Sequence, residues 1–227
     1  MKQILITGAN RGIGLELVRQ CLAADWQVIA CCREPGQAGE LQSLQCEQLE
    51  IVRLDVSDPS QVAALGGQMQ DRTLDVLVNN AGVMGGEHQT LFDLDFDAWE
   101  ETFRVNTLAP VRMIATLVPA LERASLPRIL TISSQMGAMS RDSKGAYIYR
   151  TSKAAVNKAM QLVANELAER GIIACPVHPG WVKTDMGGPH ADIDVTASAS
   201  GILALIDRLK PEDSGEFFNW NGTPHPW

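Results

Sequence analysis

The 227-residue sequence is short of basic charge, with 19 lysines and arginines against 27 aspartates and glutamates and a formal net charge of −8. No run of lysine or arginine interrupts this acidic balance. Binding to nucleic acid through its phosphates needs a clustered basic face. We therefore predict that nucleic acid is not a partner.

Metal-binding and membrane-spanning patterns are missing as well. The 5 cysteines form no CxxC pair and the 4 histidines do not pair at ligand spacing, so we expect no metal site and reduced thiols. The sequence has no apolar span long enough for a membrane helix, and its start, MKQILITGAN, lacks the apolar segment of a signal peptide. We therefore expect a cytoplasmic protein without a membrane partner.

Short apolar runs alternate with longer segments of helical periodicity. Strands are expected at 3–7, 27–32, 50–56, 74–82, 128–134 and 172–180, and helices at 13–23, 57–69, 97–123, 147–169 and 195–209. This alternation predicts one α/β domain over residues 1–227, a Rossmann-like, doubly wound parallel sheet of about seven strands. Helices on both faces would complete a three-layer sandwich, and ligands of such sheets bind at the carboxyl ends of the strands.

A glycine-rich stretch, TGANRGIG at 7–14, follows the first strand and opens the first helix. Glycine permits unusual backbone angles and close approach of a ligand to the main chain. The start of a helix offers unpaired N–H groups to a pyrophosphate. Gly8, Gly12 and Gly14 are therefore predicted to form a phosphate cradle, with a purely structural tight turn as the alternative.

Two arginines near this turn bear on the choice of nucleotide. Arg33 follows the second strand directly, where an acidic residue would favour a ribose hydroxyl, and Arg11 lies within the glycine turn. Arginine forms bidentate, charge-assisted bonds to phosphate. NADP(H) is thus favoured over NAD(H), although Glu34 comes next in the chain and two solvated surface arginines are the alternative.

Polar residues also follow the later strands. Asp55 and Val56 come after the third strand and are candidates to hold the adenine. The NNAG motif at 79–82 comes after the fourth, where Gly82 would let the backbone pass close to a ribose and a capped turn is the alternative. Ser133 and Ser134 end the fifth strand, and side-chain alternation puts only one of them in the ligand crevice.

The sequence has only 2 tyrosines, both in the stretch YIYRTSK at 147–153. In a helix, Tyr149 and Lys153 are four residues apart and share a face, whereas Tyr147 does not share it. A nearby ammonium is expected to lower the pKa of Tyr149 from about 10, which would make it a general acid or base. A solvated tyrosine and lysine on one helix face is the alternative.

Taken together, these motifs resemble the short-chain dehydrogenase/reductase family over essentially the whole chain. The resemblance also includes Asn106, the ISS motif at 132–134 and HPGWVKTDM at 178–186. Within the family, the sequence is similar to the branch of C-factor and sniffer-type carbonyl reductases. This resemblance implies NADPH-dependent reduction of carbonyl compounds, or the reverse oxidation of alcohols.

The resemblance also assigns roles to four catalytic residues. Tyr149 would exchange a proton with the substrate oxygen, and Ser134 rather than Ser133 would hydrogen-bond that oxygen. Lys153 would bind the nicotinamide ribose and depress the pKa of Tyr149, and Asn106 would hold a water that relays protons to Lys153. The predicted cofactor contacts, in addition to Tyr149 and Lys153, are Gly8, Asn10, Arg11, Gly12, Ile13, Gly14, Arg33, Asp55, Val56, Asn79, Ala81, Gly82, Pro179, Gly180, Val182 and Thr184.

Three loops surround the predicted site. The segments 83–96, 135–146 and 183–194 would shape the substrate pocket, and the last of them is predicted to be a mobile lid.

The family resemblance implies a homodimer or homotetramer formed through the helices at 97–123 and 147–169. A nucleotide-binding developmental or signalling protein with incidental dehydrogenase activity is the alternative function.

Overall fold

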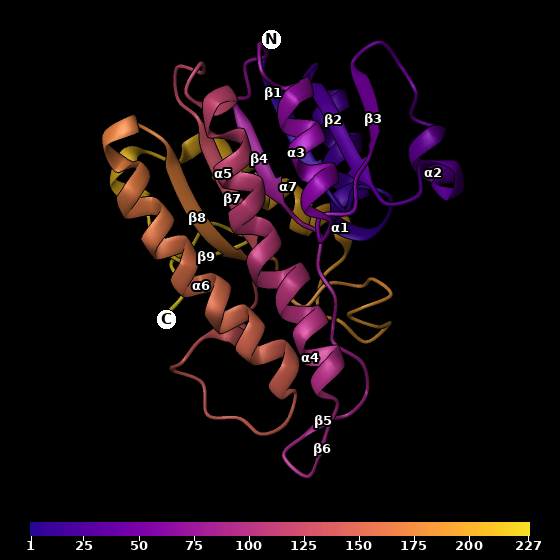
Figure 1. The fold of residues 1–227 in the computed structure, drawn as a ribbon, viewed down its shortest axis with the longest axis vertical. Coiled ribbons are helices and arrows are strands. Elements are labelled where there is room, and N and C mark those ends of the chain that lie inside the picture. The colour runs from indigo at the N-terminus through magenta and orange to yellow at the C-terminus, as the bar shows by residue number, and fades with distance from the viewer.

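A computed structural model describes residues 1–227, and a seven-stranded sheet with the order β3-β2-β1-β4-β7-β8-β9 runs through its centre (Figure 1). Every neighbouring pair in this sheet is parallel. The strands are β1 (Gln3–Thr7), β2 (Gln27–Cys32), β3 (Leu49–Arg53), β4 (Val76–Asn79), β7 (Arg128–Ile132), β8 (Ile173–His178) and β9 (Phe218–Asn219). The predicted fold class is confirmed. The chain winds in opposite directions from β1, so the carboxyl ends of β1 and β4 meet at the point where such sheets bind ligands.

Both faces of the sheet are covered because its central strands are apolar on both sides. On β1, Ile4 and Ile6 belong to one core cluster, whereas Leu5 between them belongs to the other. The first cluster packs under α1 (Gly12–Ala23), the short α2 (Gly39–Gln42) and α7 (Val195–Arg208). The second packs under α3 (Pro59–Gln68), α5 (Ala109–Leu121) and α6 (Tyr147–Leu167), which gives the three layers seen in Figure 1.

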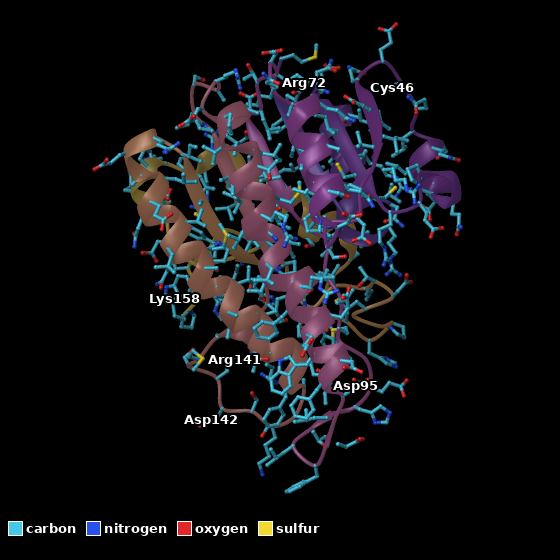
Figure 2. The ribbon with its side chains drawn as sticks, in the orientation of Figure 1. Cys46, Arg72, Asp95, Arg141, Asp142 and Lys158 are labelled. Carbon is cyan, nitrogen blue, oxygen red and sulfur yellow. The ribbon has the colours of Figure 1, made fainter.

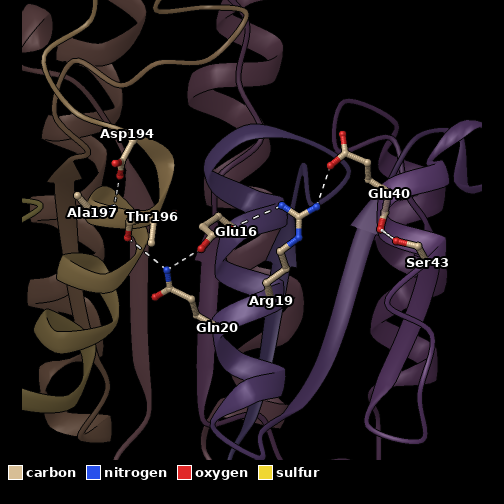
Figure 3. A network of polar contacts seen from close by, with 8 residues as sticks. All are labelled: Glu16, Arg19, Gln20, Glu40, Ser43, Asp194, Thr196 and Ala197. Atoms are coloured by element: carbon tan, nitrogen blue, oxygen red, sulfur yellow. Dashed lines mark hydrogen bonds and ion pairs between the residues drawn. The ribbon is translucent and has the colours of Figure 1, made fainter.

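A polar network fixes α1 to its neighbours on the first face (Figure 3). Arg19 of α1 pairs with Glu40 of α2 at 2.7 Å, and the Gln20 side chain donates to the Thr196 carbonyl of α7 at 3.2 Å. Asp194 caps α7 by accepting a hydrogen bond from the Ala197 N–H at 2.7 Å. The second half of α1 is therefore held on both sides.

The segment predicted as one helix over 97–123 is continuous but not regular. It consists of α4 (Phe96–Phe103), a π-helical turn (Arg104–Leu108) and α5. Pro110 lies in the first turn of α5, directly after the π-helical turn, and has no N–H to donate to the preceding turn. The π-turn contains Asn106, and such turns are frequent at functional sites.

The segment 83–96 contains a small hairpin, β5 (Gln89–Thr90) and β6 (Asp93–Leu94), that no pattern in the sequence indicated. Figure 1 shows this hairpin at the same end of the molecule as the start of α6. In Figure 2, Asp95, Arg141 and Asp142 lie toward this end, and Arg72 lies toward the opposite one. None of the helices is both long and apolar enough to cross a membrane.

Candidate active site

The glycine turn after β1 has the geometry of a phosphate cradle. Gly8 and Gly12 have positive φ angles of 64° and 55°, which favour glycine. A Cβ added at Gly14 would lie 2.3 Å from the Gly8 carbonyl oxygen, so the turn closes tightly on α1. Arg11 at the N-cap provides no side-chain cap, and the first turn of α1 has no acidic residue. The N–H groups at the start of α1 are thus available to an anion.

Thr7 and Asn80 connect the glycine turn to the end of β4 through hydrogen bonds. The Thr7 hydroxyl accepts hydrogen bonds from the N–H groups of Asn80 and Ala81, both at 3.0 Å. The Asn80 side chain donates to the carbonyls of Thr7 at 2.9 Å and Gly8 at 3.1 Å. The Asn80 side chain therefore bridges the ends of β4 and β1. Thr7 was not anticipated, although a hydroxyl directly before the first glycine is a visible signal.

Asn79 behaves differently from its neighbour. Its side-chain nitrogen donates to the Thr131 hydroxyl at 3.3 Å, whereas its side-chain oxygen is buried without a partner. Buried polar atoms are nearly always hydrogen-bonded in native proteins. An unpaired acceptor at the carboxyl end of β4 is consistent with a site for a donor from a ligand, as predicted for Asn79.

The residues predicted for the adenosine end range from exposed to buried. Arg11 forms an exposed ion pair with Asp185 at 2.7 Å, and Arg33 is exposed. The Asp55 carboxylate accepts hydrogen bonds from the N–H and the hydroxyl of Ser57 at 2.9 and 2.7 Å, which orders the loop after β3. Of the other predicted contacts there, Asn10 is exposed, Ile13 is half-buried and Val56 is buried.

Tyr149, Lys153 and Ser134 come together at the carboxyl end of β7. Tyr149 and Lys153 lie on one buried face of α6, with the Lys153 ammonium 5.7 Å from the centre of the Tyr149 ring. Ser134 lies next to Tyr149, close enough for hydrogen bonding to influence its pKa, and the Ser134 hydroxyl accepts from the Met136 N–H at 3.1 Å. Ser133 instead contacts Asn157 of α6 at 2.5 Å. The preference for Ser134 over Ser133 thus agrees with the geometry, and the shared helix face of Tyr149 and Lys153 is present.

Burial is the main cause of the pKa shifts of Tyr149 and Lys153. Desolvation raises the pKa of Tyr149 to about 12, and the hydrogen bond with Ser134 opposes this rise. Desolvation also lowers the pKa of Lys153 to about 8. The expected lowering of the Tyr149 pKa by Lys153 is therefore wrong in this structure. The ammonium donates to the Ile132 carbonyl at 2.8 Å, and loss of water around the phenol outweighs its charge.

Asn106 connects the π-turn to this group. Its side-chain oxygen accepts from the Val83 N–H at 2.9 Å, and its nitrogen donates to the Val83 carbonyl at 2.9 Å and the Ser152 hydroxyl at 3.0 Å. A Cβ added at Gly82 would lie 3.3 Å from the Asn106 oxygen and 3.6 Å from the Lys153 ammonium. Asn106 and Lys153 therefore converge on Gly82. The water relay remains a prediction.

The loop after β8 closes the site from the other side. Gly180 has a φ of 89°, and a Cβ there would lie 2.5 Å from the Ile193 side chain. The Pro179 carbonyl accepts from the Ser198 hydroxyl at 2.7 Å, and Val182 is buried. A Cβ added at Gly12 would lie 3.3 Å from the Thr184 methyl group. This loop therefore approaches the glycine turn, so the two predicted halves of the cofactor site are neighbours.

Gln89 also contacts this group, although nothing in the sequence indicated it. Gln89 is buried at the start of β5, and its side-chain oxygen accepts from the backbone N–H of Tyr149 at 3.1 Å. No motif marks a single glutamine within a loop whose conformation is unknown. A separate polar groove bounded by Gln3, Gln27 and Asp75 lies at the amino ends of the strands. It is not part of the site, because ligands bind at the carboxyl ends.

The fold and this group of side chains define a class of nucleotide-binding α/β oxidoreductases. A sequence model described as short chain dehydrogenase matches residues 2–193. The chain therefore belongs to the short-chain dehydrogenase/reductase family, and the resemblance found in its motifs is confirmed. Among curated relatives, C-signal from Myxococcus xanthus is 43% identical over 155 residues, which cover 68% of this chain and 93% of that protein.

Solved structures of carbonyl reductases have nearly the same fold. The NADPH-bound carbonyl reductase from chicken fatty liver is 36% identical, with a TM-score of 0.93 and coverage of 100% of this chain and 99% of that chain. The carbonyl reductase Sniffer of D. melanogaster is 32% identical, with a TM-score of 0.93 and full coverage of both chains. These similarities support the expected C-factor and sniffer-type branch.

Proposed function

We propose that the protein is an NADP(H)-dependent oxidoreductase that transfers hydride between the nicotinamide and a carbonyl compound or secondary alcohol. One observation carries this proposal: Tyr149 lies beside the buried Lys153 and next to Ser134 at the carboxyl end of β7. The names of the similar structures, an NADPH-bound carbonyl reductase and the carbonyl reductase Sniffer, agree with it.

The chain has the features that a dinucleotide needs. The open start of α1 would receive the pyrophosphate, and the unpaired oxygen of Asn79 would accept from a donor of the bound group. Arg11 and Arg33 would hold the 2′-phosphate. The exposed ion pair of Arg11 with Asp185 contributes little free energy and can be exchanged for a phosphate contact. When bound, NADP(H) supplies the hydride chemistry.

The side chains around Tyr149 would supply the proton and stabilise the charge. Because its pKa is raised to about 12, Tyr149 is protonated at neutral pH and suited to donate a proton to a carbonyl oxygen. The Ser134 hydroxyl would donate a hydrogen bond to the same oxygen as negative charge develops on it. Lys153 would then stabilise the phenolate that forms. Reduction is thus the direction that the protonation state favours.

Asn106 is proposed to support the return of the proton. Its side chain is held by the Val83 backbone and the Ser152 hydroxyl, and it converges with Lys153 on Gly82. A water held here would connect Lys153 to solvent and allow Tyr149 to be reprotonated. This role assigns the π-turn a function, because the turn sets the position of Asn106 on an otherwise regular helix.

We also propose a cellular location, a class of partner and an oligomeric state for the enzyme. We place it in the cytoplasm, where its five free cysteines would stay reduced, acting on small molecules rather than on nucleic acid or membranes. A homodimer or homotetramer formed through α4, α5 and α6 is part of the proposal, and a monomer in light scattering would contradict it. A purely signalling role is disfavoured, because a nucleotide sensor has no need of the Ser134–Tyr149–Lys153 group.

The experiment that tests this function is a screen of NADPH oxidation over aldehydes, ketones, quinones and dicarbonyls. For a substrate found in this way, Tyr149→Phe is expected to lower kcat by roughly 10²- to 10⁴-fold, because it removes the proton donor. Tyr147→Phe is the matched control and should retain turnover. Full turnover by Tyr149→Phe would rule out the mechanism, and tight NADPH binding without turnover across the screen would favour the signalling alternative.

A further inference from the structure

The start of α6, two residues before Tyr149, lacks an ordinary cap. Ala146 occupies the N-cap with a φ of 51° and has no side chain that could accept a hydrogen bond. The first N–H groups of any helix have no partner within the helix. In α6 the third of these belongs to Tyr149, and it is satisfied by the side-chain oxygen of Gln89, which is 60 residues away in sequence, at 3.1 Å.

Both the oxygen and the nitrogen of the Gln89 side-chain amide form hydrogen bonds. Its nitrogen donates to the carbonyls of Met84 at 2.9 Å and Gly86 at 2.7 Å, so its orientation is fixed by the segment that follows the NNAG motif. The side chain is buried and therefore shielded from competing water. The contact with Tyr149 is consequently a directed hydrogen bond between a loop and a helix.

The same segment packs against α6 at a second point. A Cβ added at Gly85 would lie 2.4 Å from the Ile148 side chain and 2.8 Å from the Thr102 hydroxyl of α4. Gly85 also has a positive φ of 86°. The segment 84–89 is therefore wedged between α4 and the first turn of α6, and Gln89 joins it to the backbone of Tyr149.

We propose that Gln89 is a positioning residue that sets the place of Tyr149 through the Tyr149 backbone N–H. This inference rests on the proposed function, in which Tyr149 donates the proton. Proton transfer needs the phenol within hydrogen-bond reach of the substrate oxygen, and small displacements of reacting groups are costly. Because Gln89 also holds Met84 and Gly86, it fixes Tyr149 relative to Gly82, which lies beside Asn106 and Lys153.

The test compares Gln89→Leu and Gln89→Asn with the wild-type enzyme. Leucine removes the acceptor, and asparagine withdraws it from the Tyr149 N–H by one carbon. We expect kcat to fall roughly tenfold in both, with KM for NADPH changed less than about twofold. Hydrogen exchange of the backbone at 147–150 should become faster, because its first-turn partner is lost. Gln89→Asn is the milder substitution, and its kcat tests the positioning role of Gln89 if the Gln89→Leu variant does not fold.

Ser214→Ala is the matched control. The Ser214 hydroxyl also accepts from the backbone N–H of a distant segment, that of Ala174 at 3.2 Å, but at the amino end of β8 and therefore away from the site. Its loss should lower stability but leave kcat and the exchange at 147–150 unchanged. A folded Gln89 variant with wild-type kcat, or an equal loss of kcat in Ser214→Ala, would overturn the inference. If Tyr149→Phe kept full turnover, the proposed function would fail separately, and the exchange readout would still report the Gln89 contact.

Discussion

At the scale of single residues, burial moves the protonation of Tyr149 and Lys153 in opposite directions along the pH scale. The pKa of the phenol is raised to about 12 and that of the ammonium is lowered to about 8. Both shifts favour the neutral side chain, as expected when charge is removed from water. In the free protein, Tyr149 is therefore expected to keep its proton at neutral pH.

The raised pKa of Tyr149 can be measured directly, because the chain has only 2 tyrosines. In Tyr147→Phe, the near-ultraviolet absorbance of tyrosinate comes from Tyr149 alone. An exposed tyrosine ionises at about 10, whereas Tyr149 should titrate near 12 in the free protein. The same variant in concentrated urea should return to about 10, and a folded midpoint at or below 10 would contradict the prediction.

The raised pKa of Tyr149 also makes the free energy of unfolding depend on pH. Between pH 10 and 12 the unfolded chain releases the Tyr149 proton while the folded chain retains it. The free energy of unfolding therefore falls as pH rises through this window, and the contribution of Tyr149 is fully present below about pH 10. Tyr149→Phe should lack this component of alkaline destabilisation in denaturant titrations at successive pH values.

Helical spacing was sufficient to select Tyr149 over Tyr147, because a four-residue separation places two side chains on one face whatever surrounds them. The direction of the Tyr149 pKa shift was not predictable in the same way. It depends on how much water the loops around α6 exclude, and those loops have no periodic pattern. Gln89 was missed for the same reason, since its partner is 60 residues away in sequence.

At the scale of elements, the strand at 3–7 was predicted best and the helix at 97–123 least well. The strand matches β1 fully, because an apolar run between turn residues has well-marked ends. The π-turn at 104–108 lies directly before Pro110, which has no backbone N–H to donate, and packing of Asn106 against Val83 and Ser152 accompanies it. The position of the π-turn within this helix was nevertheless not predicted.

Two adjacent glycines in α3 should respond in opposite ways to alanine. A Cβ at Gly66 would lie 2.5 Å from the Thr116 methyl group of α5, whereas a Cβ at Gly67 would meet nothing within 4 Å. Gly66→Ala should destabilise the protein by about 1 kcal/mol or more through overpacking. Gly67→Ala should stabilise it by about 0.5–1 kcal/mol, because alanine is the better helix former.

Urea denaturation of the two variants measures this difference, and each variant serves as the other's control. Both substitutions make the same chemical change in neighbouring positions of one helix. Equal effects of the two variants would contradict the close packing of α3 against α5.

At the scale of the whole molecule, the order of the strands assembles the site from segments that are far apart in sequence. The glycine turn follows β1, the Asn79 amide ends β4, and Ser134 follows β7. Parallel pairing puts all these ends at one edge, so this convergence could be predicted from the alternation of strands and helices. The conformations of the segments 83–96, 135–146 and 183–194 could not, because they depend on contacts between distant elements such as the hydrogen bond between Gln89 and the Tyr149 N–H.

Binding of NADPH should stabilise the whole fold, since the proposed contacts come from both halves of the sheet. A ligand at a hundred times its Kd raises the free energy of unfolding by about 2.7 kcal/mol. For a domain of this size, this corresponds to a rise in Tm of roughly 5–11 °C. NADH at the same concentration should give a smaller shift, because it lacks the 2′-phosphate that Arg11 and Arg33 are proposed to hold.

The variant Arg11→Ala/Arg33→Ala separates the phosphate contact from the rest of the cofactor site. It should lose most of the extra shift given by NADPH and keep the shift given by NADH, because the glycine turn and Lys153 are unchanged. Asp185→Ala is the control for loss of the Arg11 ion pair, which is exposed and expected to contribute little. A larger shift with NADH than with NADPH in the wild-type protein would contradict the assignment of NADP(H), whatever the variants show.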